Sequence, residues 1–267
     1  MLRSIQAECY KATHRIYFRV CMAVAALFSV GVVLCLYFIK TEASGVNPIN
    51  MPFAVTALLF GMSAGLCLVI LGVDIVFSEQ YKYNTLKNEV SFGIGRLRIY
   101  ISRWLVTLLV LGMLYLVLIG VYILASLILL GLPSQADAQA MYGVDVGRSV
   151  FNAFRALGAY TLAALPLWLG GMSLALACLF LIPNSTMASF TYLGILLLLP
   201  ALLDNLGQYV DPIFTSLYHL TLNYQMDQLI VGDLPWDKIG QCWLIGLGWT
   251  VVSTAVGAAL FARKEIK

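Results

Sequence analysis

Long apolar runs recur along this chain, and they constrain its fold more than any other feature. A helix needs roughly 20 apolar residues to cross the ~30 Å hydrocarbon core of a bilayer. Six stretches are long and apolar enough to do so: 20–39, 54–77, 105–130, 156–182, 187–203 and 242–261. The alternation of polar and apolar residues that is typical of membrane β-barrels is not found in them. We therefore predict an all-α membrane protein, with one transmembrane domain over residues 1–267 and six transmembrane helices.

The composition supports the same class of protein. Hydrophobic residues make up 61% of the chain, charged residues make up 11%, and the mean hydropathy is +0.90. An ordinary soluble domain contains about 25% charged residues. The composition thus excludes a typical soluble enzyme or binding module.

The basic residues are distributed unevenly, and this distribution predicts the orientation of the chain. Of the 16 Lys and Arg residues, 12 lie before the first apolar run, between the second and third runs, or in the C-terminal tail. The other four are Lys40, Arg148, Arg155 and Lys238. Because Lys and Arg concentrate in cytoplasmic loops, we expect both termini and the loop after the second run to be cytoplasmic. This asymmetry accounts for the net charge of +3 without a nucleic-acid partner.

Two segments outside the apolar runs have an amphipathic pattern. In residues 1–19 one apolar stripe recurs at three- and four-residue steps, through Leu2, Ile5, Cys9, Ala12 and Ile16. Lys11, Arg15 and Arg19 follow another face, and the pattern predicts an interfacial helix. Residues 204–238 are too apolar for a free loop, and Pro212, Gly232 and Pro235 interrupt them. We expect this outer segment to form re-entrant or interface-lying helices.

The polar segment 78–104, between the second and third runs, has more pattern than a tether requires. It has helix-forming content, then a Gly-x-Gly break at 93–95, then a basic amphipathic run. Tyr83, Leu86 and Val90 share one helical face. Five cations lie in the segment: Lys82, Lys87, Arg96, Arg98 and Arg103. The pattern predicts a cytoplasmic docking surface for a protein partner.

The sequence offers weak support for catalysis by this chain. Ser63 lies in a Gly-x-Ser-x-Gly string, but a nucleophilic serine needs a positioned base. The two histidines, His14 and His219, lie in the interfacial and outer segments. The same string is a Gly-x-x-x-Gly that lets helices approach closely, and this interpretation is favoured. A Walker-type motif is missing, and the six cysteines have neither metal-ligand nor disulfide spacing. We predict no catalytic residue, no metal site and no cofactor on this chain.

Asp74 is a candidate residue of a translocation path or gate. It lies in the last turn of the second apolar run. A carboxylate at that depth normally faces a bundle interior or a wet cavity. Alternatively, it reaches the nearby interface or pairs with an arginine of segment 78–104. The outer segment is also acidic, which favours cationic substrates; exclusion of Lys and Arg from the outer face explains this equally well.

Segment 78–104 resembles the loop between the second and third spans of permeases of type-2 ABC exporters. That family shows an acidic residue, a Gly-Thr-Leu-Lys/Arg-Asn string, a Leu-Leu-Ser-x-Gly turn, a Ser-Arg pair, and a Tyr and a Lys before the third span. The corresponding residues here are Glu79, Asn84-Thr85-Leu86-Lys87-Asn88, Glu89-Val90-Ser91-Phe92-Gly93, Gly95-Arg96, Tyr100 and Arg103. The departures are Asn84 for Gly, Glu89 for Leu, Gly95 for Ser and Arg103 for Lys. The interfacial start, the six runs and the long outer segment also suit the family.

The resemblance implies a transmembrane permease subunit of a bacterial plasma membrane that pairs with a second permease, identical or related. A separate cytoplasmic ATPase would bind ATP and Mg, and the segment would act as a coupling helix. The implied ATPase-coupling residues are Glu79, Tyr83, Thr85, Leu86, Lys87, Val90 and Arg96. Similar permeases, of bacitracin or lantibiotic-immunity type, export antimicrobial peptides, drugs or lipid-like compounds. We therefore expect an amphipathic substrate.

Two other functions stay open at the level of sequence. The chain could be an integral-membrane enzyme that acts on lipids, with Asp74 and Tyr or Ser residues such as Ser63 in its chemistry. It could also be a sensor or scaffold that binds an ATPase without transporting a substrate.

Overall fold

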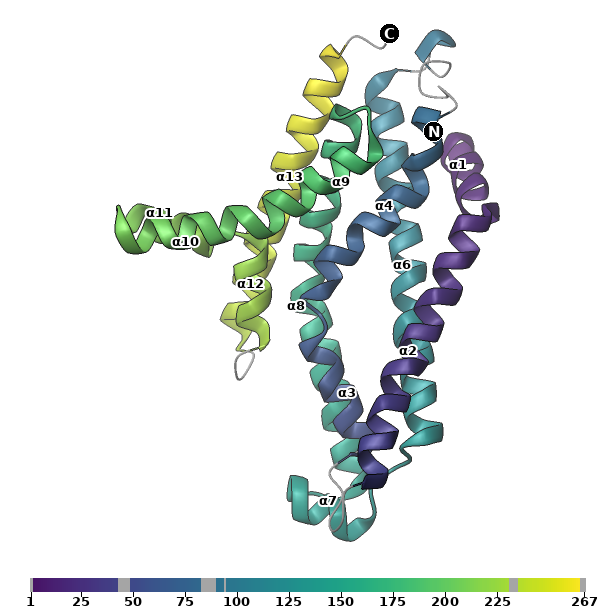
Figure 1. Cartoon of the computed structure of the whole chain (residues 1–267), viewed down its shortest axis with the longest axis vertical. Coiled ribbons are helices and arrows are strands. Elements are labelled where there is room, and N and C mark those ends of the chain that lie inside the picture. The colour runs from purple at the N-terminus through teal and green to yellow at the C-terminus, as the bar shows by residue number, and fades with distance from the viewer. Residues whose placement is uncertain (1, 43–48, 83–89, 94, 231–234, 265–267) are drawn as a thin grey trace. The chain divides into compact units, whose positions relative to one another are not determined.

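The computed structural model describes residues 2–42, 49–82, 90–93, 95–230 and 235–264, and every regular element in these ranges is a helix (Figure 1). The helices form two compact units. Unit 1 comprises Met1–Arg15, Ser63–Leu111 and Ala163–Lys267, and unit 2 comprises Ile16–Met62 and Gly112–Leu162. Two long helices, α6 (Arg96–Leu129) and α8 (Val146–Leu181), contribute to both units. The predicted all-α class is confirmed for the described residues.

Within the described residues, five helical segments are long and apolar enough to cross a membrane. They are Ile16–Thr41 in α2 (Ile16–Glu42), Arg96–Leu129, Val146–Leu181, Ser185–Tyr209, and Trp236–Arg263, which is α13. Each of them overlaps one of the predicted runs. The run 54–77 is instead divided between α3 (Met51–Phe60) and α4 (Ala64–Lys82), which make a sixth span only if they are counted together. The chain is a membrane-embedded helical protein with five candidate spans, or six on that count.

The prediction of one continuous helix over 54–77 was wrong, and the break has a local cause. The amide groups of Gly61 and Met62 bond the carbonyls of Leu58 and Leu59, three residues back. These tighter bonds end α3, and the amide of Leu66 bonds the Ser63 carbonyl to begin α4. Glycine and serine are weaker helix formers than the surrounding leucines, so the helix breaks at this string.

Unit 2 is held together by apolar packing and by side chains that reach backbone carbonyls. Its buried cluster contains Val33, Ile49, Ala54, Tyr122 and Leu130. The Tyr122 hydroxyl donates to the Ala54 carbonyl at 2.8 Å, and Lys40 Nζ donates to the Leu130 carbonyl at 2.6 Å. A polar tip that finds a carbonyl lets a large aromatic residue lie inside the unit.

Sequence analysis missed one helix of unit 2, α7 (Gln135–Tyr142). Its signals are visible in the sequence. Ser134 accepts a hydrogen bond from the Asp137 amide as the N-cap, and Gly143 ends the helix in the left-handed conformation at φ 62°.

In unit 1, α8 and α13 lie side by side at very close range (Figure 1). Gly246 of α13 faces the backbone of Pro166 and Leu167 in α8, and a Cβ at Gly246 would lie 2.7 Å from the Leu167 nitrogen. Further along, a Cβ at Gly257 would lie 2.8 Å from the Ala177 Cβ. Small residues on α13 thus permit this helix pair to pack closely.

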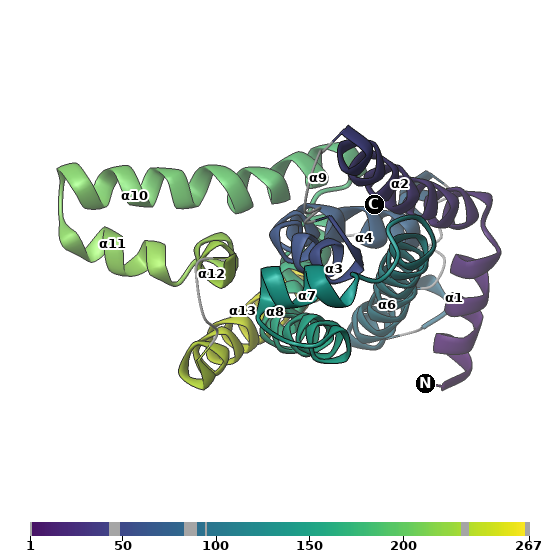
Figure 2. The same cartoon turned by 90° about the horizontal axis from the view of Figure 1, so that it is seen from below.

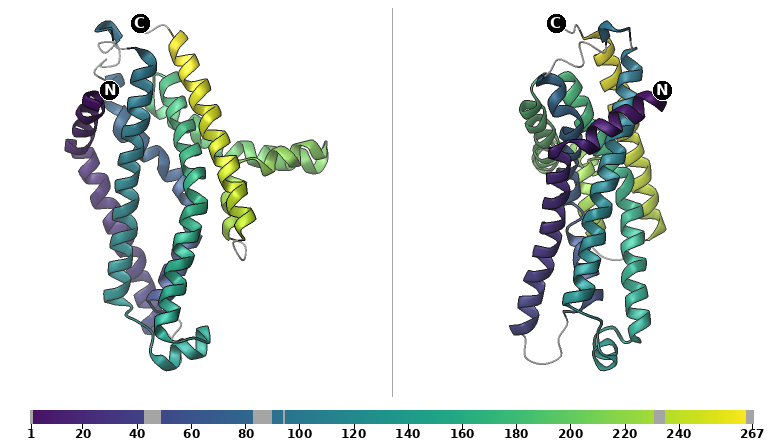
Figure 3. Two further views of the ribbon diagram at one scale, coloured as in Figure 1. Left: turned by 180° about the vertical axis from the view of Figure 1, so that it is seen from behind. Right: turned by 90° about the vertical axis from the view of Figure 1, so that its right-hand side faces the viewer.

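The predicted N-terminal interfacial helix is shorter than expected. The helix α1 (Leu2–His14) ends before Arg15, and residues 16–19 belong to α2. Arg15 donates to the carbonyl of Ile75 in α4 at 2.8 Å, so the bend places its side chain against another helix of unit 1. Figure 3 shows α1 lying across α6.

The predicted outer segment 204–238 is helical, as expected, within its described residues. The chain runs through α9 (Ser185–Leu193), a π-helical turn (Gly194–Leu198) and α10 (Leu199–Tyr209). It then forms α11 (Pro212–His219) and α12 (Leu222–Ile230). Asp211 caps α11 by accepting from the Ile213 amide, and α10 and α11 lie side by side as an antiparallel hairpin (Figure 2).

We predict that Gly246→Ala weakens the fold, because the added methyl group meets backbone atoms of α8, which have little room to move. Overpacking of this kind costs about 1–3 kcal/mol. Thermal unfolding of the purified chain in a mild detergent measures the effect. Gly248→Ala is the matched control, since no heavy atom of another residue lies within 4 Å of a Cβ there. Equal unfolding temperatures for the two variants would contradict the close packing of α8 on α13.

Candidate functional site

Several helix ends of unit 1 meet around the first turns of α6, which form the last part of the polar segment 78–104. This basic end contains the start of α6 and the C-terminal ends of α8 and α13. It is the part of the described chain where cations, buried aromatic rings and helix termini occur together. We take it as the candidate functional site.

Arg96, the first residue of α6, binds the end of α13. Its Nη1 donates to the carbonyl oxygens of Ala262 at 2.5 Å and Lys264 at 2.9 Å, and lies 3.5 Å from that of Phe261. The last carbonyls of a helix have no partner within the helix and carry partial negative charge. The guanidinium therefore satisfies the end of α13 and holds it beside the start of α6.

Lys264 makes the equivalent contact with α8. Its Nζ donates to the carbonyl oxygens of Phe180 and Leu181 at 3.0 Å each. Burial among these helix ends lowers the pKa of the Lys264 ammonium, because burial penalises the charged form. The two carbonyls compensate by accepting hydrogen bonds from the charged group.

Four aromatic rings pack beneath these contacts. Phe180 of α8 lies with its ring centre 4.6 Å from Phe77, 4.7 Å from Tyr100 and 4.5 Å from Phe261. All four side chains are buried. The rings come from α4, α6, α8 and α13, so the same helix ends that share polar contacts also share an apolar core.

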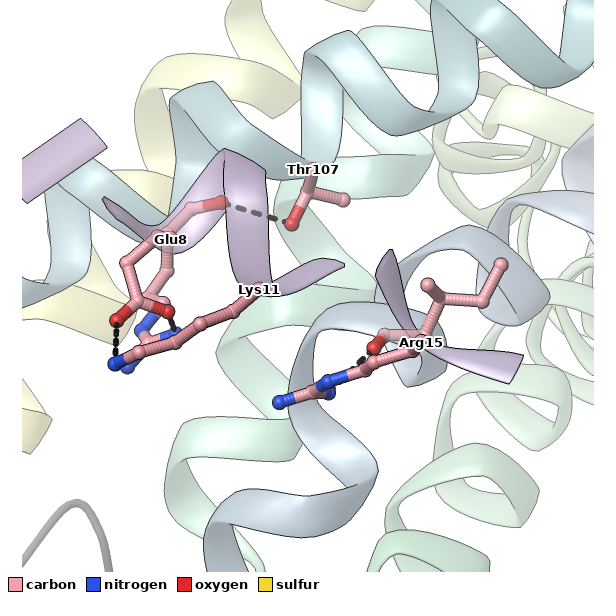
Figure 4. A network of polar contacts seen from close by, with 6 residues as sticks. Glu8, Lys11, Arg15 and Thr107 are labelled. Carbon is pink, nitrogen blue, oxygen red and sulfur yellow. Dashed lines mark hydrogen bonds and ion pairs between the residues drawn. The ribbon is translucent and has the colours of Figure 1, made fainter. Parts of the chain in front are cut away.

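A buried ion pair joins α1 to α6. Arg103 of α6 donates to the carboxylate of Glu8 in α1, and the exposed fractions of the two residues are 3% and 8%. Lys11 also reaches Glu8, at 2.9 Å, and Thr107 donates to the Arg103 carbonyl, as Figure 4 shows. Removing one member of such a pair leaves the other charge buried, which is costly.

Asp74, the candidate gate residue, lies in α4 near this end and is half-buried. Its carboxylate accepts a hydrogen bond from the hydroxyl of Ser185, the first residue of α9. The contact ties α4 to α9 within unit 1 and places a polar group beside the carboxylate. The alternatives of pairing with an arginine and of facing a cavity both remain predictions.

Part of the predicted coupling surface falls within the described residues. Val90 lies in a short helical piece and is half-buried, and Arg96 makes the contacts given above. Glu79 lies in α4, but its side chain is outside the described residues. The others are wholly outside them: Tyr83, Thr85, Leu86 and Lys87.

Two exposed apolar residues lie within the polar segment 78–104. Phe92 is 85% exposed and Leu97 is 59% exposed. Phe92 precedes Gly93, which turns the chain at φ 78° and whose amide bonds the Val90 carbonyl at 3.0 Å. An L-residue rarely adopts that φ, so glycine at 93 is what allows Phe92 to stand at the tip of the turn.

Ser63 lies at the break between α3 and α4, and the helix-packing interpretation of its glycine string holds for one glycine. A Cβ at Gly65 would lie 2.7 Å from the Trp168 indole nitrogen of α8. A Cβ at Gly61 would contact the Leu58 carbonyl of its own helix, at 3.4 Å. The six cysteines form no disulfide with one another, and the described residues contain no group of three His, Cys, Asp or Glu side chains that could hold a metal ion.

The outer segment brings aromatic and acidic side chains together. The rings of His219 and Tyr224 stack at 4.5 Å, and Tyr218 packs on Tyr224 at 4.8 Å. Burial raises the pKa of the Tyr218 hydroxyl, and the carboxylates of Asp204 and Asp227 raise it further.

Sequence analysis missed Glu8 and Lys264 as parts of the site. One signal for Glu8 was available, since it shares a helical face with the buried Ala12, four residues on. Lys264 is one of three cations in the last five residues, and nothing in the sequence sets it apart from Arg263 or Lys267.

No known family model matches this chain, and a search of curated proteins likewise finds no match.

We predict that Glu8→Gln destabilises the chain strongly, because the Arg103 guanidinium then stays buried without its carboxylate. Breaking a buried pair costs about 3–5 kcal/mol. The double variant Glu8→Gln/Arg103→Met removes both charges and should recover most of the loss. Thermal unfolding in detergent, followed by tryptophan fluorescence, measures all three proteins.

Lys11→Gln is the matched control for that experiment. Lys11 also pairs with Glu8, but its side chain is 56% exposed, and exposed pairs contribute about 0–1 kcal/mol. If Lys11→Gln and Glu8→Gln lower the unfolding temperature equally, the buried pair is not what joins α1 to α6.

Proposed function

We propose that this chain is the transmembrane permease subunit of an ATP-driven exporter in a bacterial plasma membrane. In this proposal a separate cytoplasmic ATPase, which binds ATP and Mg, docks on segment 78–104 and drives export of an amphipathic substrate. One observation carries the proposal: Arg96, which lies within that segment and begins α6, has its side chain bonded to the end of another apolar helix. A docking segment with such contacts can pass a displacement on to the helices.

The two helices that extend into the segment, one from each side, support this role. On one side α4 continues unbroken from the apolar run to Lys82. On the other side α6 begins at Arg96 and continues for 34 residues. A helix transmits displacement along its axis because its backbone is bonded turn by turn. A short polar element joined to two such helices can act as a two-state element that a partner biases.

Phe92 and Leu97 support the presence of a protein partner at this place. Both are exposed, and they lie within the segment on either side of Gly93. Large aromatic residues that are buried only on association often dominate the binding energy of an interface. We assign Phe92 to the ATPase contact, together with the residues that the resemblance implies: Glu79, Tyr83, Thr85, Leu86, Lys87, Val90 and Arg96.

The remaining parts of the proposal follow from the pattern of charges and apolar runs. We place both termini on the cytoplasmic side, count α3 and α4 as one span of six, and place α1 in the membrane interface. We further propose that the helices of 204–238 are re-entrant or interfacial and that the permease works as a dimer with an identical or related chain. Asp74, bonded to Ser185, is our candidate for a residue of the translocation path.

The substrate class is proposed from composition and resemblance. The spans are lined by aliphatic and aromatic residues, which suits a peptide antibiotic, a drug or a lipid-like compound better than a small ion. The acidic and aromatic side chains around Tyr218 suit the cationic part of such a molecule.

We predict that Phe92→Asp and Leu86→Asp each reduce recovery of the ATPase when the tagged chain is purified in mild detergent from its native membrane. An acidic group at an apolar contact would be desolvated without a partner, which weakens binding by about tenfold or more. Identification of the co-purifying proteins and an assay of their ATP hydrolysis measure the effect.

Leu132→Asp is the matched control, because Leu132 is also exposed, at 55%, but lies in the loop after α6 rather than beside segment 78–104. It should leave ATPase recovery unchanged. Recovery of intact wild-type chain with no ATPase would overturn the proposed function. Equal recovery with all three variants would remove the segment from the contact.

A further inference from the structure

The end of α13 is held at three points around Lys264. The Lys264 amide donates to the carbonyls of Leu260 and Phe261 at 3.0 and 3.3 Å. Its carbonyl accepts from Arg96 at 2.9 Å, and its side chain donates to the end of α8. Lys264 therefore contacts α13, α6 and α8 with three different groups.

The backbone of Lys264 leaves the helix in an extended conformation, with φ −68° and ψ 127°. The hydrogen bonds within α13 do not determine the direction in which the backbone continues after such an extended residue. The bonds from Arg96 to the carbonyls of Ala262 and Lys264 fix it, since they hold the residues on both sides of Arg263, the last residue of α13. The Lys264 ammonium then lies within reach of both Phe180 and Leu181.

We propose that Arg96 is a positioning residue for Lys264, and that the two side chains form a relay from α6 through α13 to α8. In the relay the guanidinium orients the Lys264 backbone, and the ammonium satisfies the last carbonyls of α8. The end of α8 thus depends on Arg96, although the bonds of Arg96 described above go to α13 and not to α8.

The aromatic rings below make the relay cooperative. Phe180, whose carbonyl accepts from Lys264, packs its ring on Tyr100 of α6 and Phe261 of α13. The same three helices are therefore joined by polar contacts at their ends and by ring contacts one layer deeper. A displacement of the start of α6 moves the ends of α13 and α8 with it, because neither layer can shift alone.

As a structural device the relay stands by itself, whereas its use in coupling rests on the proposed function. If an ATPase docks on segment 78–104, the relay gives its motion a route to α8 and α13 in addition to the direct route along α6. Motion of the docking segment would then displace both α8 and α13.

The test is hydrogen–deuterium exchange of the full chain in lipid nanodiscs, read by mass spectrometry at the C-terminal turns of α8 and α13. We expect Arg96→Gln to raise exchange at the end of α13 and also at residues 179–184, the end of α8. Loss of a hydrogen bond from a charged donor predicts an increase of about tenfold or more at each end. Lys264→Gln should raise exchange at the end of α8 to the same level.

Charge-matched neighbours serve as controls. Arg98→Gln on α6 and Arg263→Gln on α13 remove equal charge from exposed residues and should leave both helix ends unchanged. In the double variant Arg96→Gln/Lys264→Gln, exchange at the end of α8 should equal that of Lys264→Gln alone, because the two residues act in series. Independent action would instead add the two effects.

The relay is overturned if Arg96→Gln raises exchange at the end of α13 and leaves residues 179–184 at the wild-type rate. If that variant does not fold, Arg96→Lys replaces it, since lysine keeps the charge but carries it on an ammonium whose reach and geometry differ from those of the guanidinium. A partial rise at the end of α8 with Arg96→Lys supports the relay, and a rise confined to α13 overturns it.

The outcomes separate the relay from the proposed function. Co-purification of the ATPase with a failed relay test leaves the function standing and removes this route of coupling. A confirmed relay in a chain that recovers no ATPase leaves a structural brace and overturns the function.

Discussion

Backbone groups that lie away from water must find partners within the protein, and this constraint shapes the whole chain. Helices meet this constraint within the hydrocarbon core, because their amides and carbonyls bond each other. The amides and carbonyls at each helix end have no partner within the helix and need one elsewhere. The described residues provide such partners with side chains: Asn50, Ser134, Asn184 and Asp211 cap helix starts, while Arg96 and Lys264 satisfy helix ends. The basic end of unit 1 is where two such ends are satisfied by cations from neighbouring elements.

This solution gives the cations a second role. Lys and Arg in such positions are usually attributed to topology, since they keep a loop on the cytoplasmic side. Arg96 and Lys264 instead bond carbonyls at helix ends, and Arg103 bonds the Glu8 carboxylate. A segment whose charges also hold the helices together can move those helices when a partner moves the segment. In the proposed function, Arg96 and Arg103 therefore belong to the docking segment and hold the helices that it moves.

Small residues also determine how closely the helices of unit 1 pack. Gly246, Gly257 and Gly65 stand where a neighbour leaves no room for a methyl group, and each faces α8. The face of α8 that meets them is buried over much of its second half. α8 is therefore the helix on which α4, α6 and α13 pack, which explains why its last turn is the place where aromatic rings and the Lys264 ammonium converge.

The amino-acid sequence by itself determined the class of the protein and the positions of most spans, because apolar runs of about 20 residues have one stable form in a bilayer. It also predicted the helical character of 204–238, within the described residues of that segment. The glycine and serine of 61–63 mark a weak point within the second run, but only the tertiary structure showed that the helix divides there. It alone paired Glu8 with Arg103, which are 95 residues apart, and Lys264 with the end of α8. The spacing of apolar residues shows which face of a helix is buried. It does not show which part of another helix that face meets, and these contacts depend on that.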